Sequence, residues 1–165
     1  MIRIQNIYYM LAYAFQVLGE EGYKKVAAEG FEYASDLCAA ILAKAVSNQV
    51  KRGLSRDYVG KTEAVRVPIA RINVSTTLKQ NSLSKKQLVC DYDDFTEDAY
   101  MNRVLKTTAM LLLRCPEVSP DRKRALKKVL FHFSNVDEVS PFKIQWTGIN
   151  YNRNNATYKM LINIC

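Results

Sequence analysis

The spacing of apolar residues changes twice along this 165-residue chain, and this change limits the fold more than any other feature of the sequence. In the outer parts of the chain, apolar residues recur at the spacing of a helix face. Between residues 55 and 93 they alternate with polar residues in short runs, which is typical of strands. The pattern therefore predicts an α+β fold, in which helices flank a small, mainly antiparallel β-sheet.

Several helix boundaries coincide with residues that commonly start or stop helices. Asn6 and Thr96 are suitable N-caps, and Gly53 follows a basic last turn, as is common at a C-terminus. Ser119 followed by Pro120 is typical of a helix start. The predicted helical segments are 6–18, 33–52, 97–114, the segment that Ser119 opens, and 150–165.

The predicted strands are short and are separated by polar or proline-containing stretches. Pro68 divides the first two alternating runs, and residues 79–86 are polar enough to predict a loop. The strand candidates are 63–67, 71–74 and 87–92, with a further one around Phe142 to Trp146.

The same patterns suggest how the chain is organised. We expect a helical segment over 1–53, a β-rich segment over 54–96 and a second helical segment over 97–165, packed as one compact unit. The chain ends on apolar residues without a polar tail, so we expect it to be a fragment of a longer protein. Because it has neither a signal-peptide pattern nor an apolar run long enough for a membrane helix, we expect a cytoplasmic protein without membrane contact.

The positive charge of the chain is concentrated in two blocks. The net charge is +8, and residues 51–90 contain nine basic and two acidic residues. Residues 119–165 contain eight basic and three acidic residues. Such blocks can bind phosphate backbones, or they can form a solvated surface that keeps a protein soluble. The candidate nucleic-acid contacts are Lys51, Arg52, Arg56, Lys85, Lys86, Lys123, Arg124, Lys127 and Lys128.

The motifs of common catalytic and metal sites are absent from the sequence. It contains no phosphate-binding glycine loop, and its single histidine, His132, makes a histidine-dependent triad improbable. The four cysteines are widely spaced, so we expect reduced thiols rather than a zinc site. Pro120-Asp121 resembles the start of a metal-dependent nuclease motif, but no Asp/Glu-x-Lys follows it. We therefore predict no catalytic residue and no metal ligand in this chain.

Three blocks of residues resemble one known family. The first is Asn6-Ile7-Tyr8-Tyr9-Met10-Leu11-Ala12-Tyr13-Ala14-Phe15. The second is Arg52 to Tyr58, followed by Ile69-Ala70-Arg71-Ile72-Asn73. The third is Cys90 to Asp98, followed by Asn102-Arg103-Val104-Leu105-Lys106. Together they resemble McrC-type proteins, the partner subunits of McrBC modification-dependent restriction systems. Ala70 and Asn73 depart from the Gly-Arg-Ile-Asp that the family usually has there.

The resemblance implies a function as part of a larger assembly. McrC-type proteins pair with an AAA+ GTPase, McrB, stimulate its GTP hydrolysis, and carry a PD-(D/E)xK nuclease domain after the region that this chain resembles. The complex cleaves DNA that contains methylated cytosine. On this basis the chain is a non-catalytic docking and activating region, with Arg71, Asn102 and Arg103 as candidate partner contacts. Mg²⁺ would belong to the absent nuclease domain, and GTP to the partner.

Two alternatives stay open beside this reading. The basic blocks are also compatible with a nucleic-acid-binding module that has no GTPase partner. The chain could also be an interaction protein unrelated to restriction. For Arg71, the plainer interpretation is a surface charge at a strand end. For Asn102 and Arg103, it is a bond within the chain between the helix and the strands.

Overall fold

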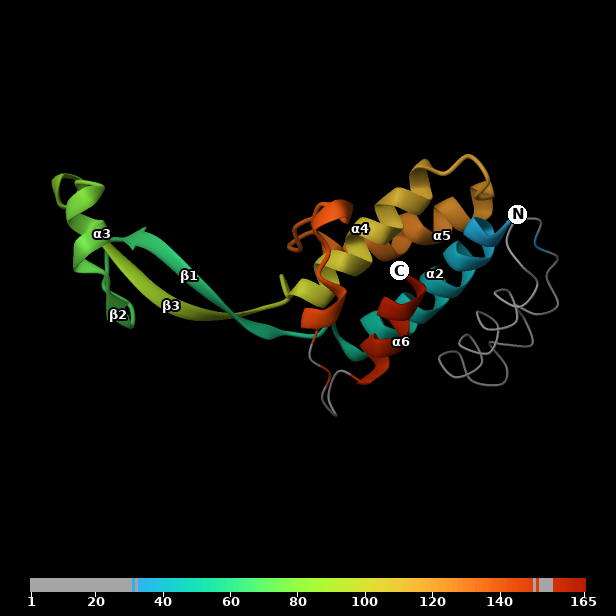
Figure 1. Ribbon diagram of the computed structural model, residues 1–165, viewed down its shortest axis with the longest axis horizontal. Coiled ribbons are helices and arrows are strands. Elements are labelled where there is room, and N and C mark those ends of the chain that lie inside the picture. Colours follow the sequence, from blue (N-terminus) through green and yellow to red (C-terminus); the bar gives the residue numbers. More distant parts are fainter. Residues whose placement is uncertain (1–30, 32, 150, 152–155) are drawn as a thin grey trace. The chain divides into compact units, whose positions relative to one another are not determined.

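The computed structural model describes residues 31, 33–149, 151 and 156–165. These residues form two compact units (Figure 1). The sheet unit contains residues 56–99, and the helical unit is assembled from the chain on both sides of it. The sequence suggested three consecutive segments packed as one unit, with the β-rich segment over 54–96. Apolar residues of the described parts of the first and last segments pack into one core.

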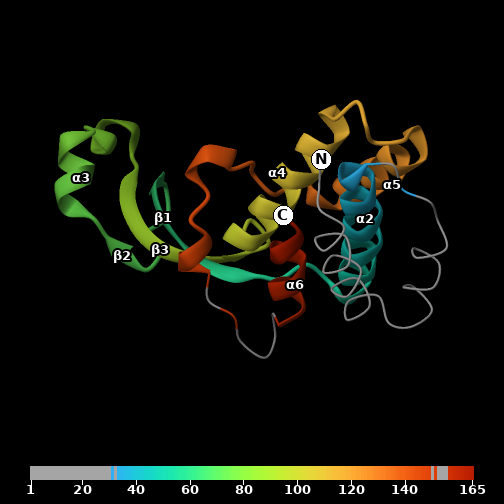
Figure 2. The same ribbon diagram turned by 45° about the vertical axis from the view of Figure 1, so that its right-hand side comes forward.

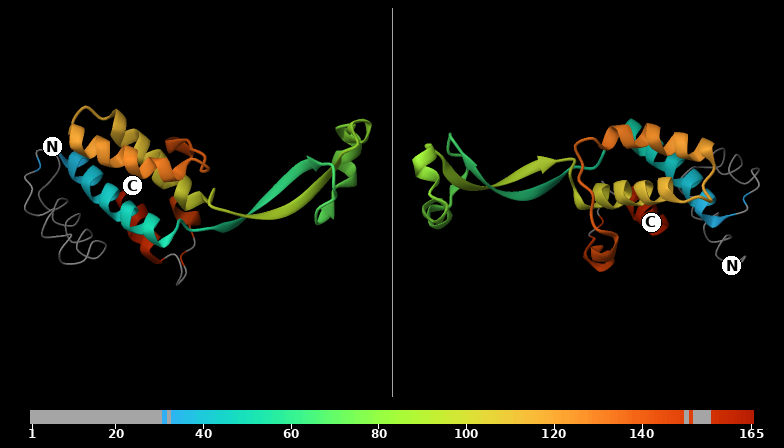
Figure 3. Two further views of the ribbon diagram at one scale, coloured as in Figure 1. Left: turned by 180° about the vertical axis from the view of Figure 1, so that it is seen from behind. Right: turned by 90° about the horizontal axis from the view of Figure 1, so that it is seen from above.

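The helical unit is built from four described helices. They are α2 (Ala34–Arg52), α4 (Tyr100–Arg114), α5 (Pro120–Leu130) and α6 (Ala156–Ile164). Helices α2 and α5 lie side by side in both views of Figure 3. The backbone N–H of Ser119 donates to Asp36 Oδ1 at 2.8 Å, so the N-termini of the two helices lie close together. Because the helices also pack side by side, they run in the same direction. At the other end of α2, Gly53 adopts a φ of 94°, a left-handed conformation that glycine tolerates without strain.

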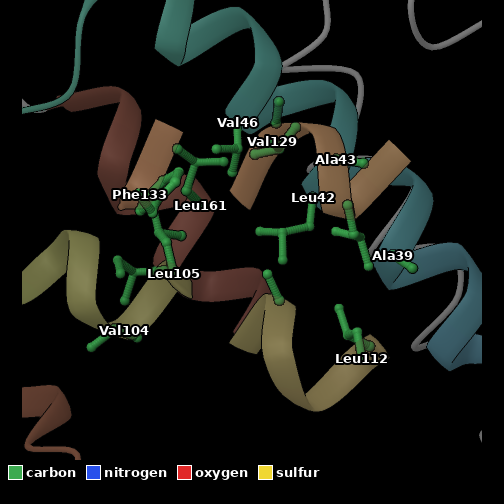
Figure 4. Packing of buried hydrophobic residues seen from close by; sticks show 14 of the residues in the cluster. Ala39, Leu42, Ala43, Val46, Val104, Leu105, Leu112, Val129, Phe133 and Leu161 are labelled. Atoms are coloured by element: carbon green, nitrogen blue, oxygen red, sulfur yellow. The ribbon is translucent and has the colours of Figure 1, made fainter. Parts of the chain in front are cut away.

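The core of the helical unit lies where these helices meet (Figure 4). Leu42 of α2, Leu105 of α4 and Leu161 of α6 point toward one another, and each is almost completely buried. Leu126 of α5 and Phe133, in the short 3-10 turn Phe131–Phe133, belong to the same cluster. Burial of each such side chain contributes about 1.5–3 kcal/mol, so this cluster is the main source of stability in the unit.

The sheet unit is a three-stranded antiparallel sheet in the order β1-β3-β2. Strands β1 (Asp57–Val65) and β3 (Leu88–Thr96) pair along their full length, and β2 (Arg71–Ile72) pairs with β3 at Asp91 and Cys90. Residues 66–87, which we call the tip segment, join β1 to β3 and contain β2, helix α3 (Val74–Lys79) and the 3-10 turn Ser82–Lys85. Figure 2 shows α3 at this end of the sheet.

The structure confirms the α+β fold and several of the predicted elements. Helix 33–52 corresponds to α2, and Ser119 and Pro120 precede and open α5 as predicted. The end of the chain, from Ala156, is helical. The predicted helix 6–18 lies outside the described residues.

Four local predictions are wrong. Strand 71–74 ends at Ile72, because the side chain of Asn73 caps helix α3 instead. The predicted loop 79–86 contains the end of α3 and a 3-10 turn. Phe142 to Trp146 forms parts of two 3-10 turns rather than a strand. Thr96 is the last residue of β3, and α4 begins only at Tyr100.

Candidate functional site

The tip segment has an exposed apolar surface. Val67 is 73% exposed, Leu78 is 62% exposed and Val74 is 61% exposed, although these side chains are normally buried. An exposed cluster of this kind usually marks a surface that a partner covers. The exposed aliphatic side chains of the tip segment are Val67, Ile69, Ile72, Val74, Leu78 and Leu83.

All charged residues of the tip segment are basic. It contains five basic residues and no acidic residue between positions 66 and 87. All five are exposed, and none of the ion pairs among the described residues involves them. They are Arg66, Arg71, Lys79, Lys85 and Lys86. The tip segment therefore combines apolar contact area with uncompensated positive charge, which suits an apolar surface with acidic residues around it.

In contrast, β1 and β3 contain one basic residue, Lys61, and five acidic residues, and some of these acids have partners within the sheet unit. Lys61 Nζ lies 2.6 Å from Asp94 Oδ2, and this hydrogen bond raises the pKa of Lys61. Arg56 Nη2 lies 2.8 Å from Glu97 Oε1. The Tyr92 hydroxyl donates to Glu63 at 3.0 Å, which raises the pKa of Tyr92. All these groups are at least partly exposed, so each pair contributes little stability. The basic tip segment therefore adjoins strands that carry a net negative charge.

Asn73 fixes the backbone of the tip segment. Its Oδ1 accepts from the N–H of Thr76 at 3.0 Å, and its Nδ2 donates to Asp91 Oδ2 at 3.1 Å. Its backbone N–H donates to the carbonyl of Val89 at 2.7 Å. Thr77 completes this arrangement because its hydroxyl donates to the Asn73 carbonyl and accepts from the Val89 N–H at 2.9 Å. The exposed residues of α3 are therefore presented on a fixed frame.

We expect Thr77→Val to loosen this frame. Thr77 is buried, so the substitution leaves the Val89 N–H without its acceptor and costs about 1–3 kcal/mol. Hydrogen exchange of the Val89 amide should become faster, and the thermal unfolding midpoint should fall. Ser75→Ala, an exposed position on the same helix, is the matched control and should change neither. Unchanged protection of Val89 in Thr77→Val would contradict this description of the frame.

The structure places the three candidate partner contacts in different environments. Arg71 is exposed on β2, opposite Asp91 in the sheet register, and is accessible to a partner. Asn102 is completely buried in α4. Arg103 is half-buried and has an interaction partner within the chain. Arg71 is therefore the only one of the three that is fully presented at the surface.

Asn102 belongs to a buried network, in line with the plainer interpretation that it bonds within the chain, but the sequence did not indicate its partners. Its Nδ2 donates to the carbonyl of Ser55 at 2.8 Å, and its Oδ1 accepts from the hydroxyl of Tyr158 at 2.7 Å. The Tyr158 hydroxyl in turn accepts from the Ser55 N–H at 2.8 Å. The three residues come from distant positions in the sequence, so no local pattern could have joined them. The network fixes Ser55, the residue at which the helical unit ends and the sheet unit begins.

The candidate nucleic-acid contacts lie in four places. Lys85 and Lys86 belong to the tip segment, and Arg56 is occupied by Glu97. Lys51 and Arg52 form the last turn of α2. The remaining four lie on α5, where Lys123 is half-buried and Arg124 pairs with Asp121; they are Lys123, Arg124, Lys127 and Lys128.

No group of acidic, histidine or cysteine side chains among the described residues is arranged to hold a metal ion. The four cysteines are free. Burial raises the pKa of Cys165 to about 11 and also raises the pKa of Cys38, so both thiols are protonated at neutral pH. None of the described helices is long and apolar enough to cross a membrane.

The described residues thus define an α+β protein with a four-helix core and a small sheet whose tip segment is exposed, apolar and basic. A family model described as "McrBC 5-methylcytosine restriction system component" matches residues 4–165. The chain therefore belongs to the McrBC restriction-component family, as the residue blocks suggested.

The chain is also similar to one curated relative, and it shares its fold with chains of two solved structures. The chain is 29% identical over 167 residues to the type IV methyl-directed restriction enzyme EcoKMcrBC of Escherichia coli K12, and it spans 47% of that protein's length. A chain in the cryo-EM structure of the Thermococcus gammatolerans McrBC complex shares its fold, with a TM-score of 0.68 and 14% identity over 96% of this chain and 48% of that one. A chain in a half-complex of McrB AAA+ hexamers with bound McrC gives the same score, covering 94% of this chain and 38% of that one.

Proposed function

We propose that this chain is a non-catalytic region of a McrC-like restriction subunit. It docks on an AAA+ GTPase of the McrB type, stimulates its GTP hydrolysis and couples that hydrolysis to cleavage of methylated DNA. Membership of the McrBC family and the fold shared with a chain of McrBC complexes support this proposal. The Mg²⁺-dependent cleavage and the GTP site belong to other parts of the assembly, which works in the cytoplasm.

The observation that carries the docking proposal is the exposed tip segment. Half-exposed aliphatic side chains such as Leu78 and Val74 each gain about 1 kcal/mol when a partner covers them. Because six such side chains lie within one segment, their combined burial is large enough to hold a partner. The frame around Asn73 holds the backbone in place, so little conformational entropy is lost on binding.

The proposal is tested by measuring GTP hydrolysis by the AAA+ protein encoded beside this gene, with and without the chain. We expect the hydrolysis rate to increase and the two proteins to co-elute. Co-elution without a rate increase would restrict the role of this chain to docking. Neither a rate increase nor co-elution would contradict the proposal.

Arg71 is the side chain that we expect to transmit the stimulation. Its guanidinium is exposed on the tip segment and can stabilise the charge that develops on a transferring phosphoryl group, or position the partner's residues that do so. Arg71→Ala should reduce the stimulated GTPase rate by about tenfold or more while co-elution persists. Lys79→Ala removes an exposed cation from the same segment and should keep most of the stimulation. Equal losses of stimulated GTPase rate in the two variants would show that stimulation depends only on the net charge of the tip segment.

A second candidate function, binding of nucleic acid without a GTPase partner, is favoured by the uncompensated cations. Lys51, Arg52, Lys127 and Lys128 are not engaged by any ion pair among the described residues. Such cations can bind phosphates directly. Binding of DNA by the chain alone, with no effect on any GTPase, would favour this function over docking.

A further inference from the structure

Helices α2 and α5 enclose a groove of about 250 Å³ that is lined by small apolar residues and cations. Its floor consists of the small or buried side chains Ala40, Ala43, Ala125 and Val129. Its rim contains three cations, Lys44 on the α2 side and Arg122 and Lys128 on the α5 side. Ser47 of α2 also lines the groove. None of the residues that line the groove is acidic.

The acidic residues of both helices lie away from this rim. The only acidic residue of α2 is Asp36, and the only one of α5 is Asp121; both are in the first turn of their helix. Asp36 accepts from the Ser119 N–H, and Asp121 pairs with Arg124. The rim lysines lie about two turns further along, and no ion pair among the described residues engages them. Lys44 and Lys128 therefore carry positive charge that no acidic side chain of these two helices compensates.

The row of cations continues along α2 beyond the groove. Lys51 follows Lys44 by seven residues, so the two side chains lie on the same helix face, about 10 Å apart along the axis. Ser47 and Asn48 lie between them and can donate or accept hydrogen bonds. Lys51 and Arg52 also line a second recess, of about 240 Å³, together with Gln49 and Thr157. A 10 Å length of duplex presents about three phosphates per strand.

We propose that this face, from Lys128 across the groove to Lys44 and Lys51, binds the phosphate backbone of DNA. Small side chains in the floor let a backbone approach closely, and the cations on both sides neutralise its phosphates. A protein partner is a poorer match, because binding hot spots need large apolar anchors and this groove presents none. Arg122 is held in place at the rim, with its guanidinium 5.6 Å from the centre of the Phe31 ring.

The binding is non-specific in sequence and independent of docking by the tip segment. It deepens the proposed function in one respect, since it gives the helical unit a direct hold on the DNA that the assembly cleaves. The two proposals can fail separately because DNA binding is measured without the partner, and co-elution is measured without DNA.

The test measures the affinity of the full chain for a fluorescein-labelled DNA duplex by anisotropy at a series of salt concentrations. We expect Lys44→Gln combined with Lys128→Gln to weaken binding about tenfold at low salt and to reduce the slope of log K against log salt by about two. Lys143→Gln combined with Lys159→Gln removes the same charge from exposed positions elsewhere in the helical unit, and should change the slope little. Thermal unfolding of both variants checks that they fold.

Three results would overturn the proposal. The first is an unchanged affinity and slope in the Lys44/Lys128 variant. The second is an equal loss in the Lys143/Lys159 control, which would reduce the effect to net charge. The third is retained DNA binding with loss of co-elution in the Lys44/Lys128 variant, which would make the groove a protein-binding surface.

Discussion

Replacing Ile72, Val74 and Leu78 together with serine is expected to weaken association with the AAA+ partner by about a hundredfold or more. Each of these side chains is exposed in the chain alone and would be covered by the partner. Loss of about 1 kcal/mol from each adds up to about 3 kcal/mol, which corresponds to about a hundredfold in the dissociation constant. Stability of the chain alone should change little, because exposed side chains contribute little to folding.

Calorimetric titration of the partner with wild type and variant measures this effect. The matched control replaces Leu111, Phe131 and Phe142, three exposed apolar residues of the helical unit, with serine. It should bind like the wild type. If the control loses affinity and the tip-segment variant retains it, the docking surface lies on the helical unit and the present assignment is wrong.

Replacing Asn102 with leucine is expected to destabilise the helical unit by about 2–5 kcal/mol. The side chain is completely buried, and the substitution leaves the Ser55 carbonyl and the Tyr158 hydroxyl with one partner fewer. Each buried group that loses its partner costs about 1–3 kcal/mol. Tyr158→Phe should cost less than Asn102→Leu. The double variant should be less destabilised than the sum of the two single variants, because both act on one network.

Urea denaturation provides the measurement. Asn135→Leu makes the same chemical change at an exposed position and should alter the free energy of unfolding by no more than about 0.5 kcal/mol. Additive effects of Asn102→Leu and Tyr158→Phe would contradict the network. If Asn102→Leu lowered the stimulated GTPase rate without changing the free energy of unfolding, Asn102 would be a partner contact.

The sequence was sufficient for elements that depend on local chemistry. Helix α2 has continuous helical spacing and a C-terminal glycine, and α5 starts at Pro120, so both could be placed from neighbouring residues alone. The general fold also follows, because the change from helical spacing to alternation separates the two kinds of structure.

Elements that depend on distant residues could not be placed. Val74 looks like the end of a strand, but Asn73 is held by Asp91 and the Val89 carbonyl, and so caps a helix instead. The segment from Phe142 to Trp146 has the composition of a strand, but the described part of its own unit contains no strand to pair with it. Backbone hydrogen bonding with a partner, rather than composition, decides such segments.

In the candidate site, too, features set by the local sequence could be predicted and features set by distant residues could not. The basic character of residues 51–90 was visible in the sequence and indicated Lys85 and Lys86, whereas Arg71 was indicated by the resemblance to McrC-type proteins. The compensation of Arg56 by Glu97 was not visible, because the two residues meet only through the pairing of β1 with β3. Lys44 was missed, although its spacing of seven residues from Lys51 on a predicted helix would have indicated a shared face.

The central claim, that the tip segment is the docking surface for the AAA+ partner, is tested most directly by hydrogen exchange of the chain with and without the partner. We expect slower exchange in residues 66–87 when the partner and GTP are present, and a smaller change in α4 and α5. Unchanged exchange throughout residues 66–87, in a complex that demonstrably forms, would contradict the claim.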